Sequence, residues 1–383
     1  MIAIGLMSGT SLDGIDAALL RIEPRERTYA VEVLNFASLP FDGDLDTRLR
    51  LALPPRTATP VQLAELHRRL GAAFARAARS ASGALAVDYI ASHGQTVYHD
   101  GAAHLTMQLG DPFVIREAMR ATVCYDFRSA DCAAGGAGAP LVPYVDALLL
   151  ASETEDRVAV NIGGIANVTA LLRGCEPHDV TAFDTGPGVM LLDTFVRMRT
   201  SGERSYDEDG RLASAGNVDE PTLIAMLGDP YFSHPAPKST GRERFGEHFL
   251  GERGASLATL SLEDGCATLT ELTAVTVASA IAGMGMPSCH VLCSGGGARN
   301  RWLMRRISAR LPGAHVETTD AVGLSARAKE TIAFAVLGYE TLRERAANVP
   351  RVTGASRATP LGAIAPHDLR RLLAQMEAEC RFS

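Results

Sequence analysis

Apolar runs of strand length alternate along the chain with segments whose apolar residues recur at helical spacing. The clearest helix is 60–80, where Leu63, Leu66, Leu70 and Phe74 share one face behind a proline suited to a helix start. Further helices are predicted at 112–119, opened by Asp111–Pro112, and from the glycine-rich loop 135–138 to about Ser152. Strands are predicted at 2–7, 15–22, 87–92, 104–110 and 122–127. This alternation indicates an α/β protein.

Two segments of the chain repeat one pattern. Residues 4–20 and 158–172 each read as an apolar strand, a turn of glycine and polar residues, and a second apolar strand. Their separation of about 155 residues suggests a duplicated fold with two lobes around a cleft, although glycine-rich turns are common in all α/β proteins. The polar connector 153–157 then divides the chain into lobes 1–152 and 153–383, with a C-terminal helix that can pack back on the N-terminal lobe.

Composition limits the class of protein. A chain of 383 residues is long for one core, and 46% hydrophobic with 21% charged residues is typical of globular proteins. The formal charge of −7 disfavours a nucleic-acid partner. Without a basic leader or an apolar run of about 18 residues, no membrane partner is expected. Seven cysteines without a C-x-x-C pair predict neither disulfides nor a zinc ribbon, so we expect a cytoplasmic protein.

The turn at 8–16 is the first candidate for chemistry. It gathers three hydroxyls, two carboxylates and two glycines, and such groups with exposed backbone N–H suit a phosphate. The turn matches neither the P-loop pattern nor the dinucleotide-binding G-x-G-x-x-G pattern. The structural alternative is a bulged hairpin.

Asp184 is the candidate base. It ends an apolar approach in "FDTGPGVMLLD" and stands beside a glycine loop, where a carboxylate can accept a proton from a bound molecule. Asp is also a good helix N-cap, and a helix is predicted just after the loop, so both interpretations stay open.

Three further stretches are weaker signals. Residues 235–245 place Lys238, Arg242 and Arg244 close together, which suits an anionic or hydroxylated ligand, unless the loop is only solvated. Residues 293–300, "CSGGGARN", allow close contact with a purine or ribose, or form a simple strand-to-helix turn. Residues 92–96, "SHGQT", are predicted to be a polar loop that reaches a ligand; no metal-ligand spacing is present there.

Taken in order and spacing, these stretches resemble the anhydro-N-acetylmuramic acid kinase family over nearly the whole chain. The matching segments are "GLMSGTSLDGIDAAL", "SHGQTVYH", "QLGDP", "YDFRSADCAAGGAGAPLVP", "NIGGIANVT", "FDTGPG", "DEDGRLASAG", "PYFSHPAPKSTGRERF", "CSGGGARNRWLM", "KETIAFAVLG" and "PRVTGA". The resemblance implies the two-lobed, duplicated ribonuclease H-like fold of sugar kinases, heat-shock ATPases and actin, with an active-site cleft between the lobes.

The resemblance also implies ATP and Mg²⁺ as cofactors. The turn at 9–16 would be the first phosphate-binding hairpin, "NIGGIAN" the second, and "CSGGGARN" the contact with adenosine. The implied nucleotide-binding residues are Gly9, Thr10, Ser11, Leu12, Asp13, Gly14, Ile15, Asp16, Asn161, Gly163, Gly164, Asn167, Gly186, Gly188, Gly295, Gly296, Gly297 and Asn300.

The implied reaction couples hydrolysis to phosphorylation. Water attacks C1 of 1,6-anhydro-N-acetylmuramic acid, a cell-wall fragment, the bridge opens, and O6 takes the γ-phosphate to give N-acetylmuramic acid 6-phosphate. Asp184 matches the family's base. The implied sugar contacts are His93, Gln95, Arg128, Asp131, Gly138, Pro140, Lys238, Arg242 and Glu330. Arg128 or Lys238 would suit the lactyl carboxylate.

The chain departs from the family pattern in a few places. Val189 stands where Asn is expected after "DTGPG", and Arg327 where an acid is expected. Residues 330–332 read Glu–Thr–Ile instead of beginning "EA". Since Val189 donates no side-chain hydrogen bond, these changes concern rate and fine specificity more than the class of reaction.

Two other functions compete with this one. A nucleotide-regulated binding module would need a partner-binding domain, whereas only a short helical tail is expected after residue 365. A kinase of another amino sugar would use Asp184 on a hydroxyl instead of water, and only the resemblance argues against it. A homodimer is compatible with the sequence, which shows no self-complementary patch.

Overall fold

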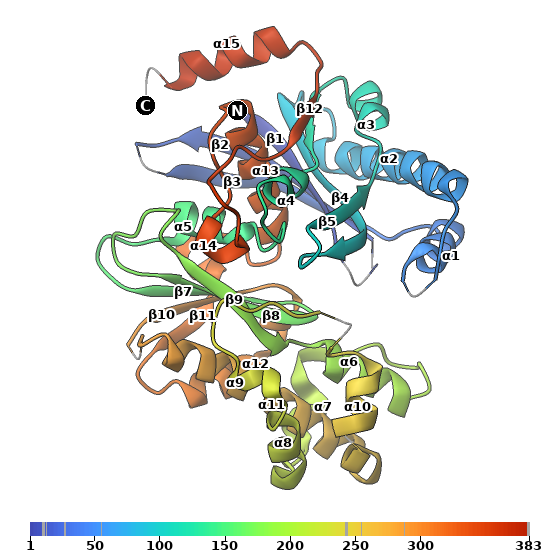
Figure 1. Ribbon diagram of the computed structural model, residues 1–383, viewed down its shortest axis with the longest axis vertical. Helices are drawn as coiled ribbons and strands as arrows, with labels where there is room; N and C mark the ends of the chain where they lie inside the picture. The colour runs from blue at the N-terminus through green and yellow to red at the C-terminus, as the bar shows by residue number, and fades with distance from the viewer. Residues whose placement is uncertain are drawn as a thin grey trace. The chain divides into compact units, whose positions relative to one another are not determined.

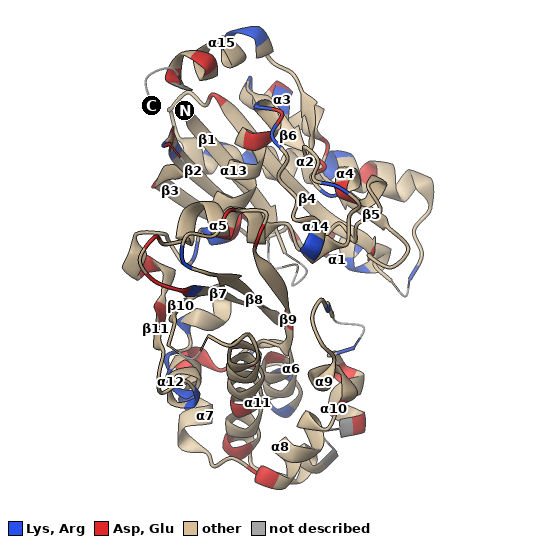
Figure 2. Cartoon of the chain, turned by 60° about the vertical axis from the view of Figure 1, so that its left-hand side comes forward, with Lys and Arg blue, Asp and Glu red and all other residues tan. Residues whose placement is uncertain are grey.

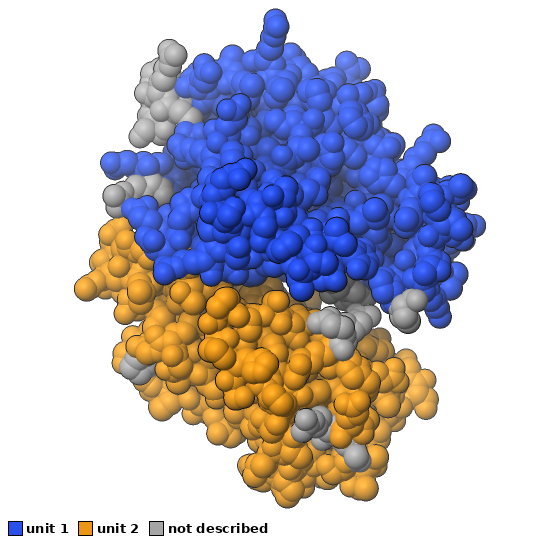
Figure 3. Space-filling model, viewed as in Figure 1, with its two compact units in different colours: residues 1–149, 176–179, 328–383 blue, residues 150–175, 180–327 orange. Residues whose placement is uncertain are grey.

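The computed structural model describes residues 1–383 except 10, 11, 13, 27, 55, 242–243, 254, 287 and 381–383. This part of the chain divides into two compact units (Figure 3). Unit 1 contains residues 1–149, 176–179 and 328–383, and unit 2 contains 150–175 and 180–327. The chain thus crosses into unit 2 near the predicted connector, whereas its last 56 residues, which the sequence pattern assigned to the second lobe, lie in unit 1.

The sheet of unit 1 has seven strands in the order β12-β6-β4-β1-β2-β3, with β5 paired to β4. Figure 1 labels β1, β2, β3, β4, β5 and β12 of this sheet. β1 and β2 form the predicted antiparallel hairpin, which β3 extends, while β4 runs parallel to β1 and β6 parallel to β4. The strands are β1 (Ile2–Ser8), β2 (Ile15–Pro24), β3 (Tyr29–Leu39), β4 (Tyr89–Asp100), β5 (Leu105–Leu109), β6 (Thr122–Tyr125) and β12 (Ala363–Ala365).

Alternate side chains of this sheet bury against two helices. Ile4, Leu6 and Ile90 join one core cluster with Leu70 and Phe74 of helix α2 (Pro60–Ser82). At the alternate strand positions, between these apolar residues, small residues pack closely against helix α13 (Lys329–Leu342). A Cβ on Gly5 would lie 1.8 Å from the Thr331 carbonyl oxygen. This contact with α13 is why the C-terminal part of the chain belongs to unit 1.

Helix starts in unit 1 follow the sequence signals. Thr59 caps α2 in a capping box with Gln62, and Asp111 caps α3 just as the Asp–Pro pair predicts. At the end of the chain, the N-terminal amine forms an ion pair with Glu379 of α15 at 3.3 Å. The other helices of unit 1 are α1 (Gly43–Ala52), α3 (Pro112–Met119), α4 (Ser129–Ala133), α5 (Val142–Leu150), α14 (Pro350–Thr353) and α15 (Leu369–Cys380).

The sheet of unit 2 has five strands in the order β11-β10-β7-β8-β9. β7, β8 and β9 are antiparallel neighbours, while β10 runs parallel to β7 and β11 parallel to β10. The strands are β7 (Arg157–Ile162), β8 (Ile165–Leu171), β9 (Thr181–Pro187), β10 (His290–Ser294) and β11 (His315–Thr318).

The two sheets share one topology. Reading β9-β8-β7-β10-β11 against β3-β2-β1-β4-β6 gives the same strand order and the same parallel and antiparallel neighbours. The repeat seen in the sequence is therefore a repeat of the fold, and the predicted duplicated ribonuclease H-like architecture is confirmed.

Unit 2 is built around helix α11 (Leu262–Gly283), whose residues contribute to two core clusters. By length and composition α11 passes as a membrane span, which the search for unbroken apolar runs missed because the helix is rich in Ala and Thr. Yet 78% of its apolar window is buried inside the protein, as expected for a core helix. The other helices are α6 (Met190–Arg199), α7 (Arg211–Ala215), α8 (Glu220–Leu227), α9 (Pro230–Ser233), α10 (Glu247–Arg253) and α12 (Arg301–Arg310). Short 3₁₀ turns cover Glu208–Gly210, Ala255–Thr259, Gly296–Arg299 and Thr319–Val322.

One prediction about local structure is wrong. The stretch 92–96 is not a loop but the middle of β4, which continues to Asp100. The strand accommodates the stretch with Gly94 at φ +75° and a shift of register against β5. His93, Gln95 and Thr96 find hydrogen-bond partners inside unit 1. Ser92 Oγ is buried without a hydrogen-bond partner among the described residues.

Candidate active site

In unit 2, three glycine-containing turns lie at one edge of the sheet. β7 and β10 are parallel and therefore end at the same edge, and β9 ends there too, since it runs antiparallel to β8. Gly163 and Gly164 join β7 to β8, Gly188 follows β9, and 295–297 follow β10. The second predicted phosphate hairpin and the predicted adenosine turn thus lie together.

These turns touch through the backbone. The Gly188 amide donates to the Gly164 carbonyl at 2.8 Å, and the Val189 amide donates to the Gly163 carbonyl at 2.9 Å. A Cβ on Gly188 would lie 2.2 Å from the Gly163 oxygen, and one on Gly295 would lie 2.6 Å from Asn161 Oδ1. Only glycine fits at both positions.

Two other glycines of the same turns face open space. Within the part of the chain that the structure describes, a Cβ on Gly296 would meet no atom within 4 Å, and one on Gly163 would meet its nearest atom at 3.5 Å. Bare backbone beside open space is what close approach of a phosphate or a nucleoside requires. The predicted asparagines of these turns have roles within unit 2 itself. Asn167 lies opposite Asn161 in the β7–β8 register, and Asn300 caps α12 by accepting from the Leu303 amide.

The first predicted phosphate hairpin lies in unit 1, and Thr10, Ser11 and Asp13 fall outside the described residues. Leu12 has φ +62° and its amide donates to the Gly9 carbonyl at 3.3 Å. A Cβ on Gly14 would lie 2.2 Å from the Leu39 oxygen, so this position also requires glycine. Ile15 is part of the core, and Asp16, which follows it at the start of β2, is half-buried.

Gln95 supports this hairpin from β4. Its side chain is fully buried, and Ser8 Oγ lies 2.6 Å from Gln95 Oε1 and 2.7 Å from the Gly14 carbonyl. Gln95 Nε2 donates to the Thr96 carbonyl at 3.1 Å. The predicted sugar contact Gln95 therefore has protein partners at both ends of its amide.

In unit 1 the buried His93 pairs with the half-buried Arg128. Arg128 Nε and Nη2 lie 3.1 and 2.9 Å from His93 Nε2, and Arg128 Nη1 donates to the Gly138 carbonyl at 2.8 Å. Burial, and then the charge of Arg128, lower the pKa of His93 well below its ordinary value. The imidazole is therefore neutral, with Nδ1 donating to the Gly94 carbonyl and Nε2 accepting from Arg128.

Arg128 stays a cation at neutral pH. Burial lowers its pKa to about 10, and the carboxylate of Glu330 acts against that shift. His93, Arg128, Gly138 and Glu330, all predicted sugar contacts, are thus close neighbours in unit 1. Pro140, two residues after Gly138 in the chain, is half-buried.

Asp131 has a different environment. Its side chain is fully buried, Oδ2 accepts from the Gly138 amide at 2.8 Å, and Oδ1 accepts from Asn348 Nδ2 and Thr353 Oγ1 at 2.7 Å each. A Cβ on Gly136 would lie 2.2 Å from Oδ2. These contacts hold the loop 135–138 to the C-terminal part of unit 1, so Asp131 shapes the loop.

In unit 2, Asp184 lies on β9 opposite Asn167, six residues before α6. The N-cap of α6 is Val189, so the helix-cap interpretation of Asp184 is excluded. Asp184 Oδ2 accepts from the Thr240 amide at 2.9 Å, and the Asp184 carbonyl accepts from the Tyr231 hydroxyl at 2.8 Å. The carboxylate is therefore fixed by the segment 231–240.

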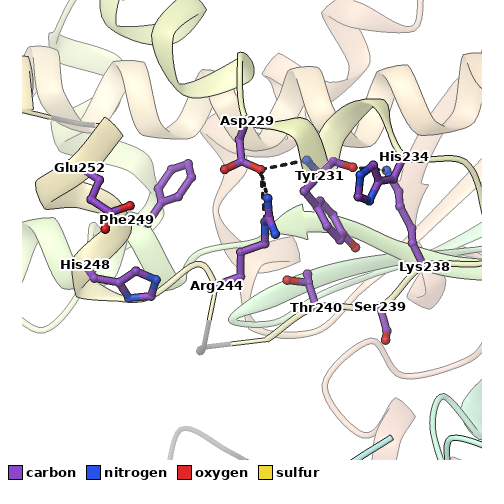
Figure 4. A pocket seen from close by; sticks show the side chains of 10 residues that line it. All are labelled: Asp229, Tyr231, His234, Lys238, Ser239, Thr240, Arg244, His248, Phe249 and Glu252. Atoms are coloured by element: carbon purple, nitrogen blue, oxygen red, sulfur yellow. Dashed lines mark hydrogen bonds and ion pairs between the residues drawn. The ribbon is translucent and has the colours of Figure 1, made fainter. Parts of the chain in front are cut away.

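That segment borders a cavity of about 620 Å³ in unit 2 (Figure 4). Its lining residues are Asp229, Tyr231, His234, Lys238, Ser239, Thr240, Arg244, His248, Phe249 and Glu252. Among the described residues, Thr240 Oγ1 is buried without a hydrogen-bond partner. The sequence analysis did not single out Tyr231 or Thr240 as candidate site residues. Both lie in the matching segment "PYFSHPAPKSTGRERF".

The predicted cationic cluster at this cavity is partly neutralised. Arg244 forms an ion pair with Asp229, with Nε 3.1 Å from Oδ1 (Figure 4). Lys238 Nζ donates to the Tyr231 carbonyl at 3.1 Å and lies 4.7 Å from the centre of the Tyr231 ring, and its burial lowers its pKa. Arg242 falls outside the described residues.

The chain is similar to known proteins over nearly its whole length. The sequence model of the family described as "Anhydro-N-acetylmuramic acid kinase" matches residues 1–367. A protein of that name from Streptomyces coelicolor is 44% identical over 96% of this chain and 94% of its own length. Another from Caldanaerobacter subterraneus subsp. tengcongensis is 38% identical over 95% of this chain and 96% of its own. The chain belongs to the anhydro-N-acetylmuramic acid kinase family.

The solved structures that resemble this chain are more distant from it in sequence. An activator of 2-hydroxyisocaproyl-CoA dehydratase from Clostridium difficile with bound ADPNP is 15% identical, with a TM-score of 0.43, and covers 89% of this chain and 95% of its own. A ROK family glucokinase from Streptomyces griseus in complex with glucose and AMPPNP is 11% identical, with a TM-score of 0.41, over 89% and 100%.

The structure gives a reason for one departure from the family pattern. Val189 caps α6 only through its backbone, and its side chain packs against the core cluster of the unit 2 sheet. The amide contact with Gly163 that positions the turn needs no particular side chain. A valine therefore preserves the backbone contact between β9 and the β7–β8 turn.

Proposed function

We propose that this family member is an ATP-dependent kinase that opens the 1,6-anhydro bridge of 1,6-anhydro-N-acetylmuramic acid and phosphorylates O6. Water adds to C1, the C1–O6 bond breaks, and O6 takes the γ-phosphoryl group of the co-substrate ATP. The products are N-acetylmuramic acid 6-phosphate and ADP, and the proton lost by the water passes to a carboxylate. Because the phosphoryl donor is ATP, we place the reaction in the cytoplasm.

Asp184 is the base in this proposal. The observation that carries it is the position of the carboxylate: Oδ2 is held at 2.9 Å by the amide of Thr240, a residue that lines the unit 2 cavity. A carboxylate fixed in this way is oriented before water arrives, and general-base catalysis contributes about 10²–10⁴-fold. Tyr231 holds the same strand residue through its carbonyl, so backbone and side chain are both positioned.

The glycine turns are proposed to hold ATP. Gly163 and Gly296 leave space that a Cβ would begin to fill, which supports phosphate at the first and nucleoside at the second. Gly188 and Gly295 keep the turns in contact. In unit 1 the hairpin turn that includes Gly9 is proposed as a further source of backbone and hydroxyl donors; its Thr10, Ser11 and Asp13 lie outside the described residues.

Mg²⁺ is proposed to accompany the nucleotide. The half-buried carboxylate of Asp16, at the end of the first hairpin turn, is a hard oxygen donor of the kind this ion prefers. When bound, the ion neutralises charge on the phosphates.

The sugar is proposed to meet Arg128 and Glu330 in unit 1. Arg128 keeps its positive charge and is oriented by His93 and Gly138, so it suits the lactyl carboxylate. Lys238 has its amine on two carbonyls and an aromatic ring, which makes it the weaker candidate for that carboxylate.

The test combines isotope labelling with substitution. Incubation with Mg-ATP and the anhydro sugar in ¹⁸O-enriched water should give a product heavier by phosphate plus water, with the label at C1. D184N should lower kcat by about 10²–10⁴-fold while ATP affinity is kept. E220Q, which changes an exposed carboxylate at the start of α8, serves as the control. An unlabelled product would overturn the hydrolytic step, and near-normal turnover in D184N would overturn the base.

A further inference from the structure

Two histidines and a glutamate meet at the far edge of the unit 2 sheet from the glycine turns. His290 and His315 are the first residues of β10 and β11 and lie opposite each other in the parallel register. Glu317 is two residues beyond His315, so its side chain is on the same face of the sheet. None of these residues takes part in the proposed reaction.

Their ligand atoms converge on one point. Glu317 Oε1 lies 2.7 Å from His290 Nε2, and Glu317 Oε2 lies 3.3 Å from His315 Nε2. One ligand atom of each residue lies within 4.8 Å of the others. Ligands of a tetrahedral ion, each about 2.0–2.2 Å from it, are separated by distances of this order.

A supporting carboxylate is already in place. His290 Nδ1, the nitrogen turned away from the cluster, lies 3.1 Å from Glu155 Oε1, and the same oxygen accepts from Arg157 Nε at 2.7 Å. In metal sites a ligating imidazole usually gives its other N–H to a carboxylate, which fixes the ring and the tautomer. Glu155 would hold His290 with Nε2 free of a proton and directed at Glu317 and His315.

The cluster is also open to ions in solution. The side chain of His290 is 12% exposed, that of Glu317 32% and that of His315 71%. Acidic residues gather in the connector just before β7, which contributes Glu155 (Figure 2). A cation therefore meets a partly buried ligand, an accessible ligand and nearby negative charge.

We propose that His290, His315 and Glu317 bind a divalent transition-metal ion of the zinc class, with Glu155 as the positioning carboxylate of His290. Two imidazoles and one carboxylate favour zinc or cobalt over magnesium, which prefers oxygen ligands in an octahedron. Three protein ligands leave one position for water. The bound ion bridges the edge strand β11 to β10, so it stabilises unit 2.

The test uses the full chain without a histidine tag and reads metal binding directly. Titration with Co²⁺ should give the visible absorption of a tetrahedral site at one equivalent, and calorimetry with Zn²⁺ should give the same stoichiometry. Added Zn²⁺ should raise the melting temperature. No step of this test depends on kinase activity.

Variants assign the site to these residues. H315A and E317Q should each weaken binding by at least about 10-fold, and E155Q by about 10-fold through loss of His290 positioning. His315 is well exposed, so H315A is the variant least able to disturb folding. H99A, which removes an exposed histidine of unit 1, is the matched control and should bind as the parent does.

Several results would overturn the proposal. One is the absence of a one-equivalent site, which would leave the cluster as a network of ion pairs around His290. Another is binding that H315A leaves unchanged. A third is a thiolate-to-cobalt absorption band, which would mean that the ion binds cysteine sulfur instead.

Discussion

In unit 1, the loop 135–138 and the first hairpin turn are held chiefly by buried polar side chains, whereas in unit 2 the glycine turns at the sheet edge are held chiefly by backbone. Asp131 binds the loop 135–138 through the Gly138 amide, and Gln95 binds the first hairpin through Ser8. In unit 2, the amides of Gly188 and Val189 bind the β7–β8 turn directly. The strand order is the same in both units, so topology does not decide how a turn is held.

The two means of support respond to different changes. A side chain that satisfies buried donors fails when its polar atoms are removed, and a titratable one also depends on pH. A turn fixed by close backbone contact tolerates changes of polarity nearby but fails when volume is added. The contrast is one of degree, since Gly5 and Gly14 of unit 1 are also tightly packed.

The largest effect is expected from removing the Asp131 carboxylate. D131A leaves three donors without their acceptor, the Gly138 amide, Asn348 Nδ2 and Thr353 Oγ1, and each buried unpaired donor costs about 1–3 kcal/mol. We expect unit 1 to lose at least about 3 kcal/mol, measured by urea denaturation with a probe in unit 1.

The control is D126A, a change in the same region. Asp126 is half-buried and bonds Ser129 near the start of α4, so its loss should cost about 1 kcal/mol, as for an ordinary cap. A D131A protein no less stable than D126A would contradict the role given to Asp131 in shaping the loop.

The matching change in unit 2 adds volume instead of removing a charge. G188A places a Cβ 2.2 Å from the Gly163 oxygen, in a contact between two backbone segments that have no flexible end to move. We expect a loss of about 2–3 kcal/mol in unit 2, measured by thermal and urea denaturation.

G163A is the control for this prediction. Its Cβ meets its nearest atom at an ordinary 3.5 Å, so stability should change by less than about 1 kcal/mol. Because the methyl group enters the space proposed for phosphate, ADP binding by calorimetry should weaken. Equal stability of G188A and G163A would remove the distinction drawn between the two glycines.

The same contrast explains what the sequence could predict. Glycine-rich turns can be recognised directly in the amino-acid sequence. The sequence therefore predicted the β7–β8 turn, the turn after β10 and the repeat of the fold. The amphipathic spacing of α2, the proline at its start and the Asp111–Pro112 pair likewise gave helices with nearly the right ends.

Polar residues that support loops were harder to interpret. Asp131 and Gln95 have the chemistry of sugar contacts, and only the structure gives their bonds to Gly138 and Ser8. For the same reason 92–96 was predicted to be a loop: nothing local shows that the distant Arg128 and Ser8 bond His93 and Gln95 inside a strand. The predicted roles of these residues toward sugar stay predictions.

A smaller effect should separate the two possible roles of Gln95. Q95A removes the partner of Ser8 that lies beside the first hairpin, and its loss should cost about 1–2 kcal/mol in unit 1. If Gln95 positions the hairpin, the KM for ATP should rise while the KM for the sugar stays the same.

Q108A is the matched control, because Gln108 is a half-buried glutamine on the neighbouring strand β5 whose side chain bonds Thr96 and Thr106. It should leave both KM values unchanged. A rise confined to the KM for the sugar in Q95A would show direct contact with the substrate and would end the assignment of Gln95 as a positioning residue.

The smallest effect is a pH dependence of the stability of unit 1, which the backbone-held turns of unit 2 should not share. Burial and the charge of Arg128 lower the pKa of His93 below the ordinary 6.5, so in acid the unfolded chain binds a proton that the folded chain does not. Full stability is present above pH 6.5 and falls as the pH drops toward the folded pKa, by up to about 1.4 kcal/mol per pH unit. The groups that face the imidazole are Arg128, His99, the Gly94 carbonyl and the Phe334 ring.

Urea denaturation of the parent and of H93Q between pH 7.5 and 5.5 measures this contribution. Carboxylates and the other histidines contribute alike in both proteins, so the difference between the two slopes isolates His93. We expect the steeper loss of stability in the parent, because glutamine takes up no proton in either state. Parallel slopes would mean that His93 is protonated as readily in unit 1 as in the unfolded chain, and the neutral Nδ1–H tautomer that orients Arg128 would then be the wrong description of this pair.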